Sequence, residues 1–450
     1  MRILARLGIR LIFIWTSAII TLIVVLILAV QFVVLGRAVA KRKAALNHSW
    51  ATVLLPLDEI PKRFPKLARN QAAMELAQLS EVLGIYRPPA PITSDDETRI
   101  KAAYPHEEDR KEFGRILPFL WEYVDKEVSG VDETIDPLPD PIQEFVLAHQ
   151  QQLSALCDRV LNNELPRWAI DLDRPDDEDF TASDDLISLQ RLLTAVTLDQ
   201  IRKGNSSDAW RTVRAAWRID EALSARPEDH VQHDVIRSAK LLVGTLLRMN
   251  PPLPPDLERF FQKDFKESFL LTYEVDSFNA LRMPRSRGRS SVFDRFRFAL
   301  FERSKFGAAS AAASQLMCDA VGRMRRQSPC DDEVRGRDPR KSPEARSDPL
   351  VMVFLPTSSF HFEQLLFRFL IERELAETVL AAKSRLLDNR EPCLAVLDST
   401  VCPGARWDCR LSSDKGSVTI SFAGSFESTE FKRFDLPLTH SWTARRTISR

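Results

Sequence analysis

Residues Leu11 to Leu35 read LIFIWTSAIITLIVVLILAVQFVVL, and this run of 25 positions contains no charged side chain. Three arginines lie in the ten residues before it, and four basic residues, Arg37 and Lys41-Arg42-Lys43, follow it. As an α-helix the run would extend about 37 Å, more than the roughly 30 Å of hydrocarbon in a bilayer. The run therefore predicts a single transmembrane helix that spans the lipid bilayer with some tilt.

A cleaved secretory signal is the alternative interpretation, because Ala38-Val39-Ala40 has the small-x-small pattern of a cleavage site. The apolar run is much longer than the roughly 7 to 15 residues of a signal peptide, and Arg37 lies inside the would-be site. We therefore expect a retained signal anchor. Basic residues number three before the span and four after it, so the positive-inside rule leaves the orientation open.

The 63 basic and 63 acidic residues cancel, so the chain has no net charge. This argues against nucleic acid as a partner.

The composition predicts a mainly α fold. Only 14 glycines and 4 tyrosines occur, a mixture that favours helices over sheets. We expect the anchor to be followed by an irregular helical bundle or a solenoid-like body.

Apolar residues recur at helical spacing through most of the chain. The segments that show this pattern are 68–83, 108–128, 141–163, 185–203, 207–225, 228–249, 256–283, 308–324 and 360–387. Proline-rich and charged stretches between them divide the chain into five predicted parts. These are a cytoplasmic tail and anchor (1–43), a juxtamembrane helix and linker (44–107), a helical body (108–326), a disordered linker (327–349) and a carboxyl-terminal helix plus β-hairpin (350–450).

The carboxyl-terminal part predicts a small α+β element. Trp407, Cys409 and Leu411 alternate with polar residues, a glycine-containing turn follows at 412–416, and residues 418–422 alternate again. Period-two alternation on both sides of such a loop is typical of a β-hairpin. Residues 431–438 are expected to add a third strand.

Six cysteines occur, and three of them, Cys393, Cys402 and Cys409, lie within 17 residues. In an oxidising compartment, Cys402 would pair with Cys409 or with Cys393. The alternative is that all six are ordinary reduced cysteines, because no pair has the CxxC spacing of zinc or redox sites.

Motifs of known catalytic chemistry are absent. The chain has no GxxxxGK[ST] phosphate loop, no GxSxG elbow and no HExxH zinc motif. His230 and His233 are the best metal-ligand candidates, because residues at i and i+3 share a helix face. They need a distant third ligand, and a capped helix start with acids in its first turn is the default interpretation. No cofactor is expected.

The segment 282–305 collects seven arginines and one lysine between phenylalanines. Arg285, Arg287 and Arg289 would contact an anionic surface, either lipid or nucleic acid. The alternative is a polar loop followed by an amphipathic helix whose phenylalanines face inward.

Two resemblances extend these expectations. Gly204, Ala209, Val213, Ala216 and Pro227 resemble one tetratricopeptide unit, although the proline comes later than in that pattern and no second copy follows. The chain also resembles a group of uncharacterised bacterial envelope proteins with one amino-terminal anchor, a helical body and a short β tail. The residues that carry this second resemblance are 73–84, Pro166-Arg167-Trp168, Ala209-Trp210 to Ala216-Trp217, 372–377 and 402–407.

Two functions are compatible with these features. The first is a membrane-anchored, non-catalytic scaffold or partner-binding protein with protein partners. The second is a membrane-tethered enzyme with a dispersed metal or hydrolytic site, for example His230 and His233 with a distant carboxylate. The envelope resemblance implies a bacterial inner membrane, and together with the clustered cysteines it favours a body on the extracytoplasmic side.

Overall fold

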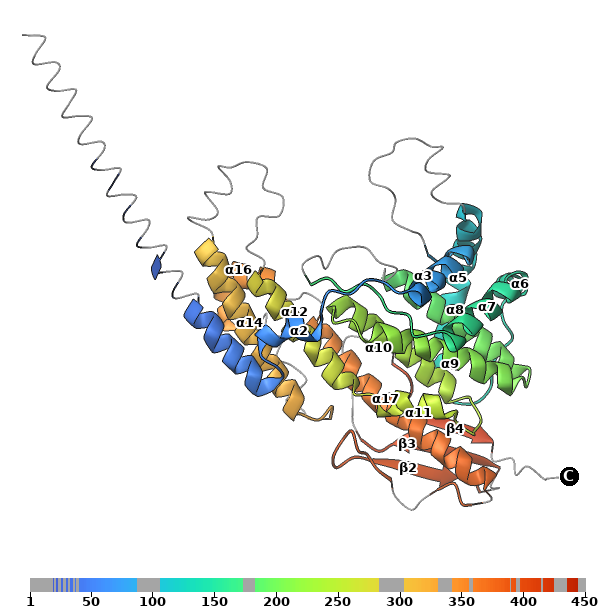
Figure 1. The fold of residues 1–450 in the computed structure, drawn as a ribbon. Coiled ribbons are helices and arrows are strands. Elements are labelled where there is room, and N and C mark those ends of the chain that lie inside the picture. The colour runs from blue at the N-terminus through green and yellow to red at the C-terminus, as the bar shows by residue number, and fades with distance from the viewer. Residues whose placement is uncertain are drawn as a thin grey trace, which may run out of the picture. The chain divides into compact units, whose positions relative to one another are not determined.

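The chain is mainly helical, with one small antiparallel sheet near its carboxyl end (Figure 1). The computed structural model describes residues 40–86, 106–172, 183–282, 303–330, 342–355, 359–388, 390–393, 397–413, 416–424 and 435–443, with seven positions between 19 and 37. No helix among these residues is long and apolar enough to cross a membrane. Most of the run from Leu11 to Leu35 lies outside them, so the anchor stays a prediction.

Two compact units make up the chain. Unit 1 combines residues 1–60, 274–322 and 338–356, and unit 2 combines residues 61–273, 323–337 and 357–450. Each unit thus gathers segments that are far apart in the sequence, whereas the sequence analysis divides the chain into consecutive parts.

Unit 1 is built on close contacts between small side chains and one tryptophan. Helical residues 40–53 lie beside α14 (Arg303–Arg326), and Trp50 is fully buried with its Nε1 donating to Ser314 Oγ at 3.2 Å. Buried alanines and serines of α14 permit the close approach expected from its composition. The other described helices of this unit are η1 (Leu57–Glu59), α15 (Pro343–Ser347) and α16 (Pro349–Phe354). Since α15 lies within residues 327–349, the predicted linker is not wholly unstructured.

Unit 2 contains the helices predicted from the apolar spacing except the one over 308–324, which is α14 of unit 1, and in most cases their ends lie within two or three residues of the predicted ends. They are α3 (Gln71–Val82), α5 (Glu107–Val128), α6 (Asp140–Ala148), α7 (Gln150–Asn162), α8 (Ser183–Arg202), α9 (Ser206–Leu223), α10 (Asp229–Leu246), α11 (Pro255–Gln262), α12 (Phe265–Arg282) and α17 (Ser359–Leu387), with the short α2 (Ile60–Arg63) at the boundary between the units. The boundary also falls within α12. Helices α8, α9 and α10 pack against one another, as short connections predict.

Two predicted helices are each broken in two. The helix expected over 141–163 ends at Ala148, because His149 adopts φ −106° and ψ 18°, and a new helix starts at Gln150. The helix expected over 256–283 is interrupted at Lys263, whose backbone is extended. There the Oδ1 of Asp264 accepts from the backbone N–H of Glu267 at 2.8 Å and caps the second helix.

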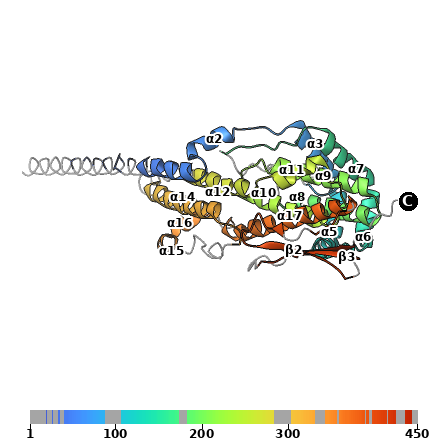
Figure 2. The ribbon, with the colours of Figure 1, turned by 90° about the horizontal axis from the view of Figure 1, so that it is seen from below.

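The sheet has the order β1-β2-β3-β4, and all of its pairs are antiparallel. The strands are β1 (Leu397–Asp398), β2 (Arg406–Leu411), β3 (Ser417–Phe422) and β4 (Thr439–Thr443). The hairpin of β2 and β3 confirms the prediction from alternation. A third strand was predicted at 431–438, of which residues 431–434 lie outside the described residues. Residues 435–438 are not a strand, because Pro437 has no N–H and the Leu436 N–H donates to Glu372 at 2.8 Å, and β4 follows them. Helix α17 lies along this sheet (Figures 1 and 2).

A buried carboxyl group joins α8, α9 and α10. Asp220 is 1% exposed, and its Oδ1 accepts from Gln190 Nε2 at 2.8 Å and from Ser238 Oγ at 2.6 Å. Its Oδ2 has no hydrogen-bond partner among the described residues. Burial raises the pKa of Asp220 from 3.8 to about 8. The group is therefore a neutral acid at pH 7, and its proton removes the cost of a buried charge.

Replacing Asp220 with Asn tests this protonation. Between about pH 4 and pH 8 the folded chain keeps the proton that the unfolded chain releases, so the unfolded state binds fewer protons and wild-type stability falls as the pH rises. Asn keeps the Oδ1 acceptor and does not titrate. We expect Asp220→Asn to gain stability over wild type from pH 5 to pH 8, by up to about 1.4 kcal/mol per pH unit. The midpoints of urea unfolding of both proteins at pH 5, 6.5 and 8 measure this difference.

The matched control is Asp208→Asn, which changes an exposed acid in the first turn of the same helix. It should follow the wild-type pH dependence. If Asp220→Asn also follows the wild-type dependence, Asp220 is ionised in the fold and the interpretation is wrong.

Candidate functional site

The predicted histidine pair is only partly described. His233 is 4% exposed and its ring lies 5.7 Å from the ring of Phe269, so it is part of the core of unit 2. The side chain of His230 lies outside the described residues. A metal site at His230 and His233 therefore stays a prediction. The same holds for the anionic-surface contact, because Arg285, Arg287 and Arg289 also lie outside the described residues.

The cysteines form two disulfides, but not the predicted ones. Cys330 pairs with Cys402, and Cys393 pairs with Cys409. The expected bridges from Cys402 to Cys409 or to Cys393 are thus wrong. Cys409 lies on β2 opposite Ile420, and Cys402 lies in the loop before β2. The partner of Cys402 comes from a segment 72 residues earlier, which no local spacing indicates. Cys157 and Cys318 are buried and reduced.

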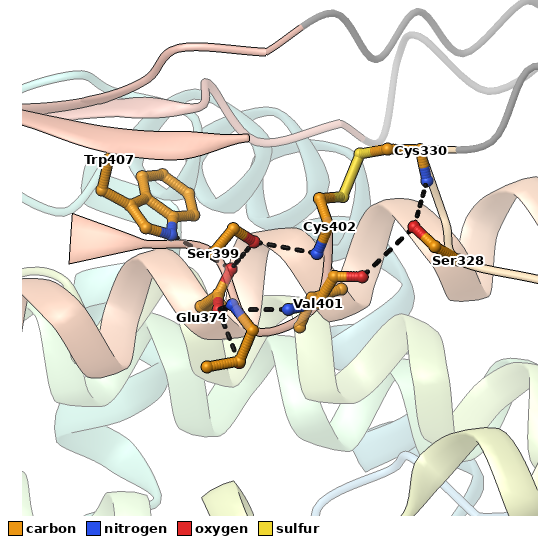
Figure 3. The surroundings of a disulfide bond; sticks show 8 residues. Ser328, Cys330, Glu374, Ser399, Val401, Cys402 and Trp407 are labelled. Carbon is orange, nitrogen blue, oxygen red and sulfur yellow. Dashed lines mark hydrogen bonds between the residues drawn. A yellow bond between two sulfur atoms is a disulfide. The ribbon is translucent and has the colours of Figure 1, made fainter. Parts of the chain in front are cut away.

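A buried carboxylate of α17 holds the loop that carries Cys402 (Figure 3). Glu374 Oε2 accepts from Ser399 Oγ at 2.5 Å and from Trp407 Nε1 at 3.0 Å. Its Oε1 accepts from Thr400 Oγ1 at 2.7 Å and from the backbone N–H groups of Thr400 at 2.5 Å and Val401 at 3.3 Å. Because five donors surround this carboxylate, it is satisfied within the fold and acts as a structural anchor for the loop.

A cavity of about 680 Å³ in unit 2 lies beside β4. We call it the Lys383 cavity. Side chains of α17, β4 and the loop after α5 line it, among them Asp132, Glu133, Lys383, Ser441 and Trp442. The Ser441 N–H donates to the carbonyl of Val131 at 2.7 Å, which fixes the loop against the edge of the sheet.

Lys383 is the only lysine that lines this cavity within the described residues, and its ammonium group is fully engaged. It donates to Glu133 Oε1 at 2.6 Å, Leu247 O at 2.9 Å and Met249 O at 3.1 Å. Burial lowers the pKa of Lys383, while Glu133 opposes the shift. Since an ammonium has three N–H donors, none remains for an anionic ligand.

His440 lies behind the cavity, next to Trp442, and carries no charge. It is fully buried on β4, and burial, with Lys383 and Arg248 nearby, lowers its pKa to about 2. The imidazole is therefore uncharged at physiological pH. The charge that the Lys383 cavity offers to a ligand is then the carboxylate of Asp132, which is exposed.

One group of metal-capable side chains occurs among the described residues. Asp109, Glu112 and His149 each offer one ligand atom, and these atoms lie within 4.8 Å of one another. This group was not predicted, because residues 141–163 were expected to form one continuous helix. The signal that could have found it is His106-x-x-Asp109-x-x-Glu112, three side chains at helical spacing at the start of α5.

Comparison with known proteins gave no match to any protein-family model, curated protein or solved structure.

Proposed function

We propose that this chain is a membrane-anchored, non-catalytic partner-binding protein whose body lies on the extracytoplasmic side. We further propose that the Lys383 cavity binds a segment of a protein partner that carries a cationic side chain. The observation that carries the proposal is the charge state of this cavity. Its lysine has no donor left, its neighbouring histidine is neutral, and the carboxylate of Asp132 is exposed.

The anchor is supported by the described positions of the apolar run. Ile19, Leu22, Leu26, Val30, Val33 and Val34 are all helical and between 51% and 68% exposed. An apolar helix with this much exposure is stable only when lipid or another apolar surface covers it.

The orientation is supported by the cysteine chemistry. One disulfide joins β2 to Cys393 and the other joins the loop before β2 to Cys330, and disulfides persist in oxidising compartments such as the bacterial periplasm. A body in the reducing cytoplasm would keep these thiols free.

The number of free thiols per chain tests the orientation. Intact cells are quenched with acid, the full chain is denatured without reductant, and thiols are labelled with a maleimide of known mass. We expect two labels, on Cys157 and Cys318, and six after reduction. Six labels without reductant would place the body in the cytoplasm and contradict the proposal.

Crosslinking in the native membrane tests the cavity. A photoreactive amino acid at Thr134, which lines the cavity, should give a discrete crosslinked product with a partner. Because the cationic group is expected to pair with Asp132, Asp132→Lys in the same chain should abolish the product.

Glu122→Lys is the matched control, because it reverses an exposed acid on α5 outside the cavity. It should leave the crosslinked product unchanged. A product that persists at full yield in Asp132→Lys, or no product in the parent chain, would show that the cavity does not bind a cationic partner segment.

A further inference from the structure

We propose that His149, Asp109 and Glu112 bind one divalent transition-metal ion, for which Zn²⁺ is the best fit. This site is independent of the partner-binding proposal and lies where the start of α5 meets the junction of α6 and α7. Its three ligand atoms come from two separate segments of unit 2 and lie within 4.8 Å of one another. A bound ion would therefore join two parts of the fold.

The hydrogen bonding of the histidine leaves one ring nitrogen for a metal. His149 is 7% exposed, and its Nδ1 lies 3.0 Å from the carbonyl oxygen of Phe145. A carbonyl oxygen only accepts, so Nδ1 carries a proton and donates it. Nε2 has no hydrogen-bond partner among the described residues and is the nitrogen that can bind a metal. A backbone carbonyl that fixes the second nitrogen in this way is the usual arrangement around metal-bound histidines.

The backbone break in the helix pair gives this imidazole its position. His149 ends α6 and precedes α7, and its ring stacks on Phe145 with 4.2 Å between the centroids. Phe145 contacts Phe113 of α5 at 5.7 Å. The imidazole is thus held against α5 by packing, so a metal ion would meet a preorganised ligand.

The carboxylates complete the donor set. Asp109 and Glu112 lie one turn apart on α5 and are partly exposed. Asp109 Oδ2 lies 2.9 Å from His106 Nδ1, a contact that orients this carboxylate. Glu112 has no hydrogen bond or ion pair with any described residue. Two neighbouring carboxylates repel each other, and a divalent cation between them and the imidazole removes that cost.

The start of α5 is held in place by a glycine. Gly84 has φ +69°, and a Cβ there would lie 2.2 Å from the carbonyl oxygen of Asp109. The chain after α3 therefore approaches the backbone of Asp109 closely, which only glycine permits. The backbone that carries Asp109 is therefore held in place, and the partly exposed carboxylates of Asp109 and Glu112 remain reachable by an ion.

The donor types select the metal. Calcium and magnesium prefer sites made only of oxygen ligands, whereas imidazole nitrogen suits zinc and its neighbours in the first transition row. One imidazole and two carboxylates leave a fourth position for water, which is the pattern of an open zinc site.

Direct binding of Zn²⁺ tests the proposal. The full chain, purified in detergent without a polyhistidine tag and stripped with a chelator, is titrated with Zn²⁺ against a competing dye. Co²⁺ absorption reports the coordination independently. We expect one ion per chain. Glu112→Gln and His149→Asn should each weaken binding by at least about tenfold, and His106→Ala by about 10- to 100-fold, the range for residues that orient a ligand.

Glu107→Gln is the matched control, since it changes an exposed acid in the same first turn of α5. It should bind Zn²⁺ as the wild type does. Glu112 is partly exposed, so its variant remains informative if His149→Asn does not fold; circular dichroism checks the folding of both. Absence of binding, or equal affinities of wild type and Glu112→Gln, would overturn the proposal.

Discussion

The charged side chains buried along α17 are the constraint on which the rest of unit 2 depends. Glu372, Glu374 and Lys383 are 0%, 7% and 4% exposed, and each binds backbone groups of a segment that is neither helix nor strand. Burying such charges costs several kcal/mol each unless they are paired and hydrogen-bonded. Backbone N–H groups of irregular segments donate to Glu372 and Glu374, and backbone carbonyls accept from Lys383. Oε2 of Glu372 has no hydrogen bond among the described residues and is compensated by an ion pair. Glu372 also lies 3.1 Å from Lys240 and 3.0 Å from Arg368.

These contacts explain how a short sheet is stable next to a helical body. A four-stranded sheet with a two-residue edge strand has little core of its own. Glu374 holds the loop before β2, Glu372 holds the chain before β4, and two disulfides hold the loop and β2 covalently. Lys383 then joins the end of α10 to the loop at Glu133. The Lys383 cavity is bounded by segments that these contacts position.

Helical spacing and strand alternation predicted most elements, because both reflect which face of an element is buried. Ile142, Phe145 and Leu153 are all buried as their spacing predicts, yet the break at His149 depends on one side chain binding a backbone carbonyl. A hydrogen bond of this kind can end a helix without changing the spacing of the apolar residues. The disulfide of Cys330 and the grouping of Asp109, Glu112 and His149 depend on contacts between segments that are distant in the sequence. Spacing along one segment carries no information about them, so the sequence pointed instead to Cys409 and to His230 with His233.

Hydrogen exchange at three loop amides tests the role of α17 most directly. The N–H groups of Thr400 and Val401 donate to Glu374, and that of Leu436 donates to Glu372. If these carboxylates organise the sheet, the three amides exchange as slowly as those inside β3, although none lies in a strand. Exchange as fast as that of the exposed residue Glu391 would show that the loops open independently of α17 and would contradict the account.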